Sequence, residues 1–216
     1  MKVDARRKPS REEKHAATSA ALLRAAAATF AERGFGAATM DEIAERAGLT
    51  KGALYYRYKS KEDLFLALLD ERCAAYVAAL DHTLANEASA GAGWAAFSDQ
   101  FLAILREGSW PRLYFEYVSY ASRNPHARRQ LVKRTRELRS AFERVIERQA
   151  AETGTDLPVP AADIALAITA LGNGIALERL ADPRGVPDRV VAELPALIIA
   201  GVAARAGRHH DERKAR

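Results

Sequence analysis

Apolar residues recur along most of this chain at the three- and four-residue spacing of helices. Leu22, Ala26 and Phe30 form one such stripe, which predicts a first helix over about 18–33 that Gly34 ends. Similar stripes predict helices over about 61–84, 94–108, 111–124, 126–151, 161–181 and 187–206. No alternating apolar pattern flanked by hairpin turns indicates strands. The sequence therefore predicts an all-α fold.

Between the first two of these stripes, residues 39–58 (TMDEIAERAGLTKGALYYRY) predict two short helices joined by a glycine turn. Thr39 and Glu42 have the capping-box spacing of a helix start. Gly48 lies where a left-handed residue ends a helix, and Thr50 can cap the next one. Two helices joined in this way form a helix-turn-helix, which is a common DNA-binding unit, although an ordinary helical corner has the same spacing.

The second helix of residues 39–58 has an inner side at Leu54 and a basic, aromatic outer side. The small residues Gly52 and Ala53 allow its backbone to approach DNA closely. Lys51 and Arg57 can reach base edges, and the neighbouring tyrosines can reach phosphates. This outer side favours binding in a DNA major groove.

The segment from Leu22 to Leu64 resembles the N-terminal domain of TetR-family transcriptional regulators. The matching pieces are LLRAAAATFAERGFGAATM and IAERAGLTKGALYYRYKSKEDL, about 45 residues in all. The second piece contains the specific pattern G-[LV]-[ST]-x-G-x-[LI]-Y, followed by SKE-x-L. The resemblance implies a three-helix helix-turn-helix DNA-binding domain over 18–65 and a larger helical domain for effector binding and dimerisation over 66–207.

The resemblance also implies a role for individual residues of the motif. Thr39 would contact a phosphate, and Thr50 would cap the recognition helix and contact the DNA backbone. Positions that contact bases in the family are occupied by Lys51, Ala53, Tyr56 and Arg57, and positions that contact phosphates are occupied by Tyr55 and Lys61. Many relatives carry Arg or Lys where this chain has Ser19, and a basic arm ahead of it can supply that phosphate contact.

Charge is concentrated at the N-terminal end. Residues 1–65 hold 13 Lys/Arg and 9 Asp/Glu, a net of +4, whereas the rest of the chain contributes only +1 to the total of +5. Residues 1–17 form a polar arm with six basic residues, which we expect to be flexible unless Ser10 and Glu13 start the first helix early. The charged segment 208–216 is expected to be a solvated tail. This distribution fits contact with a polyanion such as DNA.

The single cysteine, Cys73, excludes an intramolecular disulfide and fits a reducing compartment. The N-terminal residues lack the apolar segment of a signal peptide. No uncharged apolar run reaches the 18 residues of a membrane span, since the longest candidate stops at Glu178. We therefore expect a cytoplasmic protein with no membrane partner.

The predicted helix over 161–181 is apolar on two sides. Ile164, Ile168, Leu171 and Ile175 line one face, and Leu166, Ala170, Leu177 and Leu180 line another. A helix that is apolar on two sides is buried on two sides, so we expect one face to meet another subunit. The resemblance implies a homodimer through the helices over about 161–181 and 187–206, and therefore a pseudo-palindromic operator in double-stranded DNA. Pro195 is expected to kink the last helix or to delay its start.

Aromatic residues gather over 94–120, and the family resemblance implies a pocket for an unknown small-molecule effector in this domain. The candidate ligand-binding residues are Phe97, Phe101, Trp110, Tyr114, Tyr117 and Asn173. Asn173 lies on an apolar face between two glycines, where a buried amide needs a hydrogen-bond partner. The alternative for each of these rings is an ordinary filled core.

Enzyme motifs are absent from the sequence: there is no GxSxG, P-loop, GxGxxG or HExxH pattern. Cys73 and His82 lie on opposite faces of one predicted helix, so they form no dyad. No metal or cofactor site is predicted. The sequence thus predicts a dimeric repressor that leaves its operator when it binds an effector. The alternatives are an all-α enzyme or small-molecule carrier, and a constitutive DNA-binding protein without an effector.

Overall fold

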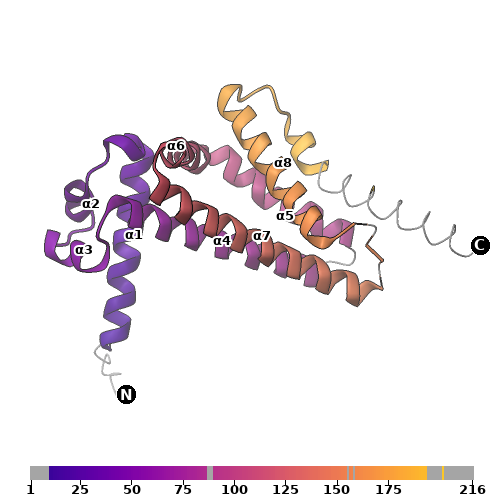
Figure 1. Ribbon diagram of the computed structural model, residues 1–216, viewed down its shortest axis with the longest axis horizontal. Coiled ribbons are helices and arrows are strands. Elements are labelled where there is room, and N and C mark those ends of the chain that lie inside the picture. Colours follow the sequence, from indigo (N-terminus) through magenta and orange to yellow (C-terminus); the bar gives the residue numbers. More distant parts are fainter. Residues whose placement is uncertain (1–9, 87–89, 155, 158, 194–200, 202–216) are drawn as a thin grey trace, which may run out of the picture. The chain divides into compact units, whose positions relative to one another are not determined.

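The computed structural model describes residues 10–86, 90–154, 156–157, 159–193 and 201. In this described part every regular element is a helix, which confirms the all-α prediction (Figure 1). The helices are α1 (Arg11–Ala37), α2 (Met40–Arg46), α3 (Lys51–Arg57), α4 (Lys61–Asn86), α5 (Ala90–Glu107), α6 (Ser109–Arg123), α7 (Pro125–Thr153) and α8 (Ala161–Ala181). The chain divides into two compact units, Met1–Leu69 and Asp70–Arg216, which we call the head and the body.

Helix α1 of the head begins at Arg11, seven residues before the predicted start. Ser10 is its N-cap: the Glu13 N–H donates to Ser10 Oγ at 3.1 Å, and the Ser10 N–H donates to Glu13 Oε2. Each of these bonds satisfies an N–H that the helix itself leaves free. The early start that the Ser10–Glu13 spacing allowed is the one observed, so residues 11–17 of the expected flexible arm are helical, and residues 1–9 lie outside the described part. Gly34, with φ 75° and ψ 164°, interrupts the helix where the sequence predicted its end.

The core of the head joins the motif helices to α1 and to the first turns of α4. The rings of Phe30 and Phe35 lie 5.7 Å apart, and those of Phe35 and Phe65 meet edge to face at 5.8 Å. Ile43 of α2 and Leu54 of α3 are fully buried. Helices as short as α2 and α3 are not stable alone. Burial of these two aliphatic residues therefore stabilises the helices and fixes the position of α3.

Helix α7 carries the clearest end signals of the body. Asn124 Oδ1 accepts hydrogen bonds from the N–H groups of His126 and Ala127, and Pro125 occupies the first helical position, where no N–H is needed. Gly154, with φ 65°, ends the helix in the left-handed conformation. The observed helix is two residues longer at its C-terminal end than the predicted 126–151.

The helices of the body pack around two apolar clusters. One joins Leu80 of α4, Phe97 of α5 and Phe142 of α7 to Ile164 of α8. The other joins Leu102 and Leu105 of α5 to Ile175 of α8 and to Val191, which follows α8. Along α7, Arg134 Nε pairs with Asp70 at 2.7 Å and Arg148 pairs with Asp81. These ion pairs join α7 to the part of α4 that belongs to the body. Helix α5 begins at Ala90, so residues 90–93, predicted as loop, are helical.

The C-terminal part of the body is described only as far as Glu193, with Gly201 beyond it. Residues 188–193 are helical, close to the predicted start at 187. Arg179 donates to the Val186 carbonyl at 2.9 Å and pairs with Asp188, which also accepts from Arg106 at 2.5 Å. Both guanidinium groups lower the pKa of Asp188, Arg106 having the larger effect. The remainder of the predicted last helix, including the expected kink at Pro195, lies outside the described residues.

Candidate nucleic-acid interface

The start of α2 is fixed by a complete capping box. The Thr39 N–H donates to Glu42 Oε2 at 3.1 Å, and the Glu42 N–H donates to Thr39 Oγ1 at 3.2 Å. The hydrogen bonds from Thr39 are the main cause that lowers the pKa of Glu42, and the charges of Arg33 and Arg46 add to the effect. Thr39 is thus an exposed residue whose side chain is already oriented at a helix N-terminus, which is where a phosphate binds favourably.

The turn between α2 and α3 depends on Gly48 and Thr50. Gly48 has φ 67°, in the left-handed region that favours glycine, and the Leu49 N–H donates to the Ala44 carbonyl at 3.0 Å. Thr50 Oγ1 then accepts from the Ala53 N–H at 3.2 Å and starts α3. The local sequence therefore produces the helix-turn-helix as predicted.

Helix α3 has one buried residue, Leu54, and an exposed opposite side. The side of Tyr56 is the most open, because that residue is 72% exposed, while Tyr55 is 44% exposed. A Cβ added to Gly52 would have only Thr50 Oγ1 within 4 Å, at 3.9 Å. Among the predicted DNA-binding residues, the exposed ones are Thr39, Thr50, Lys51, Gly52, Tyr55 and Tyr56, and Ala53, Arg57 and Lys61 are half-buried. The outer side of α3 is thus open to solvent and leaves room for a partner as large as DNA.

The three cations predicted to contact DNA each have a partner within the head. Lys51 Nζ donates to Asp41 Oδ2 at 2.5 Å, and this bond raises the pKa of Lys51. The Arg57 guanidinium donates to the hydroxyl of Ser19, so the residue that departs from the family pattern holds α3 to α1. Both contacts orient a long side chain that would otherwise be mobile.

Lys61 closes the end of α1. Its ammonium group donates to the Gly36 carbonyl at 2.7 Å and lies 5.0 Å from the centre of the Phe35 ring. A cation beside free carbonyls at a helix C-terminus is stabilising. This partner was not readable from the motif, because the two residues are 25 positions apart.

Lys59 is a cation that the sequence analysis did not single out. It is exposed directly after α3, and its ammonium group donates to the Tyr55 carbonyl at 3.0 Å. No carboxylate neutralises it in the part of the head that the structure describes. Its place between Tyr58 and Ser60, next to the aromatic end of α3, is the signal that could have identified it.

The predicted ligand-binding residues of the body separate into core and half-buried positions. Phe97 is 7% exposed and packs edge to face on Phe142 at 6.0 Å, and Tyr117 is completely buried. Phe101 is half-buried, and a Cβ added to Gly172 would meet its ring at 3.4 Å. The Trp110 ring lies 5.3 Å from the Arg72 guanidinium carbon. Phe97 and Tyr117 therefore belong to the core, and the side chain of Trp94 lies outside the described part.

Tyr114 and Asn173 are brought together in the body. Burial raises the pKa of Tyr114, while hydrogen bonds with Thr135 and Asn173 and the charge of Arg139 lower it. Asn173 is exposed, contrary to the buried position expected from its apolar face, because no described residue covers this side of α8. Arg139 Nε is buried and has no hydrogen-bond partner among the described residues. Nearby, burial raises the pKa of the Cys73 thiol to about 11, so that this thiol is protonated at neutral pH.

One face of α8 is apolar and exposed. Leu166 and Leu177 are 45% and 51% exposed, and Ala170 is exposed between them. Within the part of the chain that the structure describes, α8 is also the one helix with the length and hydropathy to cross a membrane, although only 22% of that segment is buried. A helix that packs against another protein passes the same test, so this is weak evidence for a membrane span.

Two family models match the chain. The model for bacterial regulatory proteins of the tetR family matches residues 22–68, and the C-terminal model for BetI-type transcriptional repressors matches residues 95–204. Together they cover both the head and the body.

Among curated relatives, the HTH-type transcriptional activator FasR of Mycolicibacterium smegmatis is 40% identical over 99 residues, or 44% of each chain. The uncharacterized HTH-type transcriptional regulator YfiR of Bacillus subtilis is 28% identical over 72% of this chain and 77% of its own. The match thus spans less than half of FasR and about three quarters of YfiR.

Solved structures share the fold. A putative TetR-family regulator from Mesorhizobium loti superposes with a TM-score of 0.71 over 91% of this chain and 98% of its own, at 16% identity. The regulator FadR from Bacillus subtilis, solved in complex with stearoyl-CoA, gives a TM-score of 0.66 over 82% and 97%, at 15% identity. At these identities the likeness concerns the fold.

Proposed function

This chain belongs to the tetR family of bacterial regulatory proteins and is a DNA-binding transcriptional regulator, and on that premise we propose that it is a cytoplasmic homodimeric repressor, not an enzyme, that a small molecule releases from a pseudo-palindromic operator. The observation that carries the proposal is the exposed outer side of α3, at Gly52, Tyr55 and Tyr56, opposite the buried anchor Leu54. A helix with an open outer side fits the major groove.

The residues of the motif have two different proposed roles. Tyr56 and Lys51 contact base edges, whereas Thr39, Thr50, Tyr55 and Lys59 contact the DNA backbone. Ala53 and Gly52 permit the close approach of α3. Arg57 and Lys61 have hydrogen-bond partners inside the head, which supports a positioning role for both in addition to any contact with DNA.

Selection of bound sequences from random duplex DNA, with the full-length protein, tests operator binding. We expect a pseudo-palindrome to be recovered. In a mobility-shift assay on that sequence, Tyr56→Ala should weaken binding roughly tenfold or more. The matched control is Arg24→Gln, which changes an exposed residue on α1 that has no ion pair in the described head and should change affinity little. Binding without sequence preference, or equal losses in both variants, would refute operator recognition by α3.

The exposed face of α8 supports the homodimer. Leu166, Ala170 and Leu177 would otherwise remain in water, which costs about 25 cal/mol per Å² of apolar surface. Leu177→Asp should therefore convert the dimer to a monomer in sedimentation experiments. Val159→Asp is the control, because Val159 is 37% exposed but precedes α8. A wild-type monomer at micromolar concentration would contradict the dimer proposal.

The Tyr114–Asn173–Arg139 group supports effector binding in the body. A buried donor without a partner is costly, and a ligand group that accepts from Arg139 Nε removes that cost. A metabolite library screened by thermal shift should give a ligand that also releases the protein from its operator. Arg139→Gln should abolish that release while operator binding without ligand persists. If no ligand changes operator affinity, the protein is a constitutive regulator.

Transcription in vitro from an operator-bearing promoter distinguishes repression from activation.

A further inference from the structure

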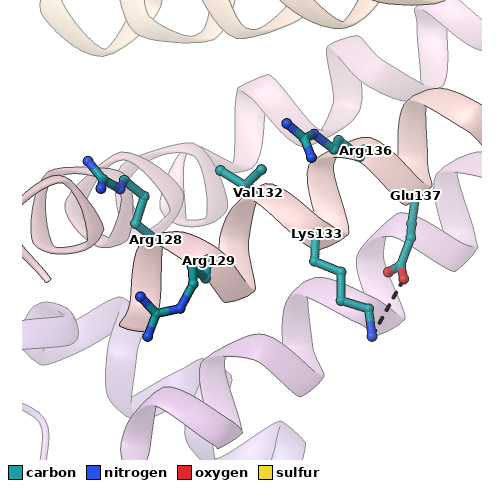
Figure 2. A pocket seen from close by; sticks show the side chains of 6 residues that line it. All are labelled: Arg128, Arg129, Val132, Lys133, Arg136 and Glu137. Carbon is teal, nitrogen blue, oxygen red and sulfur yellow. Dashed lines mark ion pairs between the residues drawn. The ribbon is translucent and has the colours of Figure 1, made fainter. Parts of the chain in front are cut away.

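The outer face of α7 forms a hollow of about 420 Å³ (Figure 2). Its lining residues all come from successive turns of this one helix: Arg128, Arg129, Val132, Lys133, Arg136 and Glu137. The set contains four cations and one carboxylate. We call it the α7 groove.

The arginines of the α7 groove have no counter-charge among the described residues, whereas several other arginines of the body do. Arg134, Arg148 and Arg179 pair with Asp70, Asp81 and Asp188. In contrast, no side chain of the described residues forms an ion pair or hydrogen bond with the guanidinium groups of Arg128, Arg129 and Arg136. Only Lys133 has a partner, Glu137 at 3.8 Å, and both of these side chains are more than 60% exposed. The α7 groove therefore has an uncompensated positive charge.

The position of the α7 groove along the helix increases this charge. Arg129 and Lys133 are four residues apart, and Lys133 and Arg136 are three apart, so like charges are neighbours on the surface of the helix, which destabilises a helix. The groove also starts near the N-terminus of α7, where the helix dipole is positive. An anion bound in the groove would relieve both effects.

The chemistry of the lining residues indicates which anion. Arginine guanidinium groups bind phosphate in a planar, two-point geometry. Arg128 and Arg136 are eight residues apart, or roughly 12 Å along the helix, which exceeds the reach of one phosphate. The volume of about 420 Å³ falls in the range of small-molecule sites, about 300–1,000 Å³, and the hollow lies open along one helix, which leaves room for a compact ligand. We propose that the α7 groove binds a small soluble polyphosphate anion, such as a nucleotide with a pyrophosphate group.

Calorimetric titration of the full-length protein with inorganic tripolyphosphate tests the proposal. We expect saturable binding, with orthophosphate at equal ionic strength binding much more weakly. Arg136→Gln should weaken tripolyphosphate binding roughly tenfold, and the triple variant Arg128→Gln/Arg129→Gln/Arg136→Gln should abolish it. Arg144→Gln is the matched control, because Arg144 is an exposed arginine on the same helix, outside the groove. Melting temperatures without ligand verify that each variant is folded.

Three outcomes would overturn the α7 groove as a polyphosphate site. The first is no saturable binding of tripolyphosphate, or equal binding of orthophosphate. The second is an equal loss in Arg136→Gln and Arg144→Gln, which would indicate unspecific attraction by net charge. The third is a triple variant that keeps tripolyphosphate binding but loses salt-dependent affinity for random-sequence duplex DNA, which would make the groove a DNA contact. The site is independent of the operator proposal, since Tyr56→Ala tests the head alone.

Discussion

The cations of the head and those of the α7 groove in the body have opposite surroundings. Beside the exposed side of α3, each predicted DNA-contacting cation has a partner in the head itself: Lys51 has Asp41, Arg57 has Ser19, and Lys61 has the Gly36 carbonyl. On α7, the three arginines of the groove have no such partner among the residues that the structure describes. A side chain with a hydrogen-bond partner has less rotamer freedom to lose when it binds DNA. The head therefore suits recognition of one fixed DNA surface. Free arginines suit attraction of an anion that orders them when it binds.

The largest expected contrast is between the buried and the exposed residue of α3. Leu54→Ala removes a side chain that is fully buried and should lower the free energy of unfolding of the head by about 2–5 kcal/mol. Hydrogen exchange of residues 40–57 would measure this loss. Tyr56→Ala should change that exchange by less than about 0.5 kcal/mol and weaken operator binding instead.

The body provides the control for that pair. Both tryptophans of the chain, Trp94 and Trp110, belong to the body, so tryptophan fluorescence follows its unfolding. Leu54→Ala should leave this fluorescence transition unchanged if the two units are stabilised separately. A shift as large as that seen by hydrogen exchange in the head would contradict the division at Leu69.

The next contrast compares one backbone feature in the two units. Gly48 in the head and Gly154 in the body have φ 67° and φ 65°, and an added Cβ would meet nothing within 4 Å at either position. Alanine at each should therefore cost about 1–2 kcal/mol through backbone strain alone. Chemical unfolding would measure both losses. Only Gly48→Ala should also weaken operator binding, because it changes how α3 leaves the turn, and an equal effect of Gly154→Ala would contradict that assignment.

The sequence predicted local features well in both units and distant contacts poorly. The capping box at Thr39, the left-handed Gly48 and the helix boundaries near residues 151 and 161 follow from residues within a few positions of each other, so their spacing suffices. The contact between Ser19 and Arg57 joins residues 38 positions apart, and no local rule indicates it. The sequence did not decide where the first helix begins. The Ser10–Glu13 spacing predicts a start at Arg11, whereas the polar composition of residues 1–17 is typical of a flexible segment.

The candidate sites show the same limit. Phe97 and Tyr117 share an aromatic segment with Trp110 and Tyr114, yet the first two are core and the others are half-buried. A helical stripe gives the side on which a residue lies and not what covers it, since that depends on which helix packs there. Asn173 illustrates the point, because its face of α8 is apolar but uncovered in the single chain. The α7 groove was missed because a charged helix is usually a solvated face, and the hollow between its cations is visible only in the structure.

A smaller effect is expected from the helix caps. Thr39→Ala removes the N-cap of α2, and Asn124→Ala removes that of α7, so each should lower stability by about 1 kcal/mol. Thermal unfolding of the two variants would measure this, with Thr39→Ser and Asn124→Asp as controls that keep an oxygen acceptor. Operator binding should respond to Thr39→Ala alone, because the Thr39 hydroxyl is also a proposed phosphate contact. If Thr39→Ser bound no better than Thr39→Ala, the hydroxyl would have no such role.

The smallest effect is the acid sensitivity of one carboxylate in each unit. The pKa values of Glu42 and Asp188 are both lowered, Glu42 mainly by hydrogen bonds from Thr39 and Asp188 by hydrogen bonds from Arg106 and Arg179. A lowered pKa in the folded state means that the contribution to stability is complete above the unfolded value, at about pH 4. It is lost as the pH falls through the lowered value. Glu42→Gln and Asp188→Asn should each reduce the loss of stability between about pH 5 and pH 2, measured by urea unfolding.

Added salt should separate the two carboxylates. Asp188 pairs with Arg106, whose side chain is 63% exposed, and with Arg179, whose side chain is 12% exposed. Salt screens charges beyond about 10 Å in 0.1 M salt and about 3 Å in 1 M salt, and it weakens the exposed Arg106 pair most. The main contacts of Glu42 are hydrogen bonds from an uncharged threonine and from its backbone, which salt screens little. In 1 M salt the effect of Asp188→Asn should therefore shrink while that of Glu42→Gln persists. An equal response of both variants would mean that Glu42 in the head, like Asp188 in the body, is stabilised mainly by charge pairing. The contrast between the two units would then not hold for these two carboxylates.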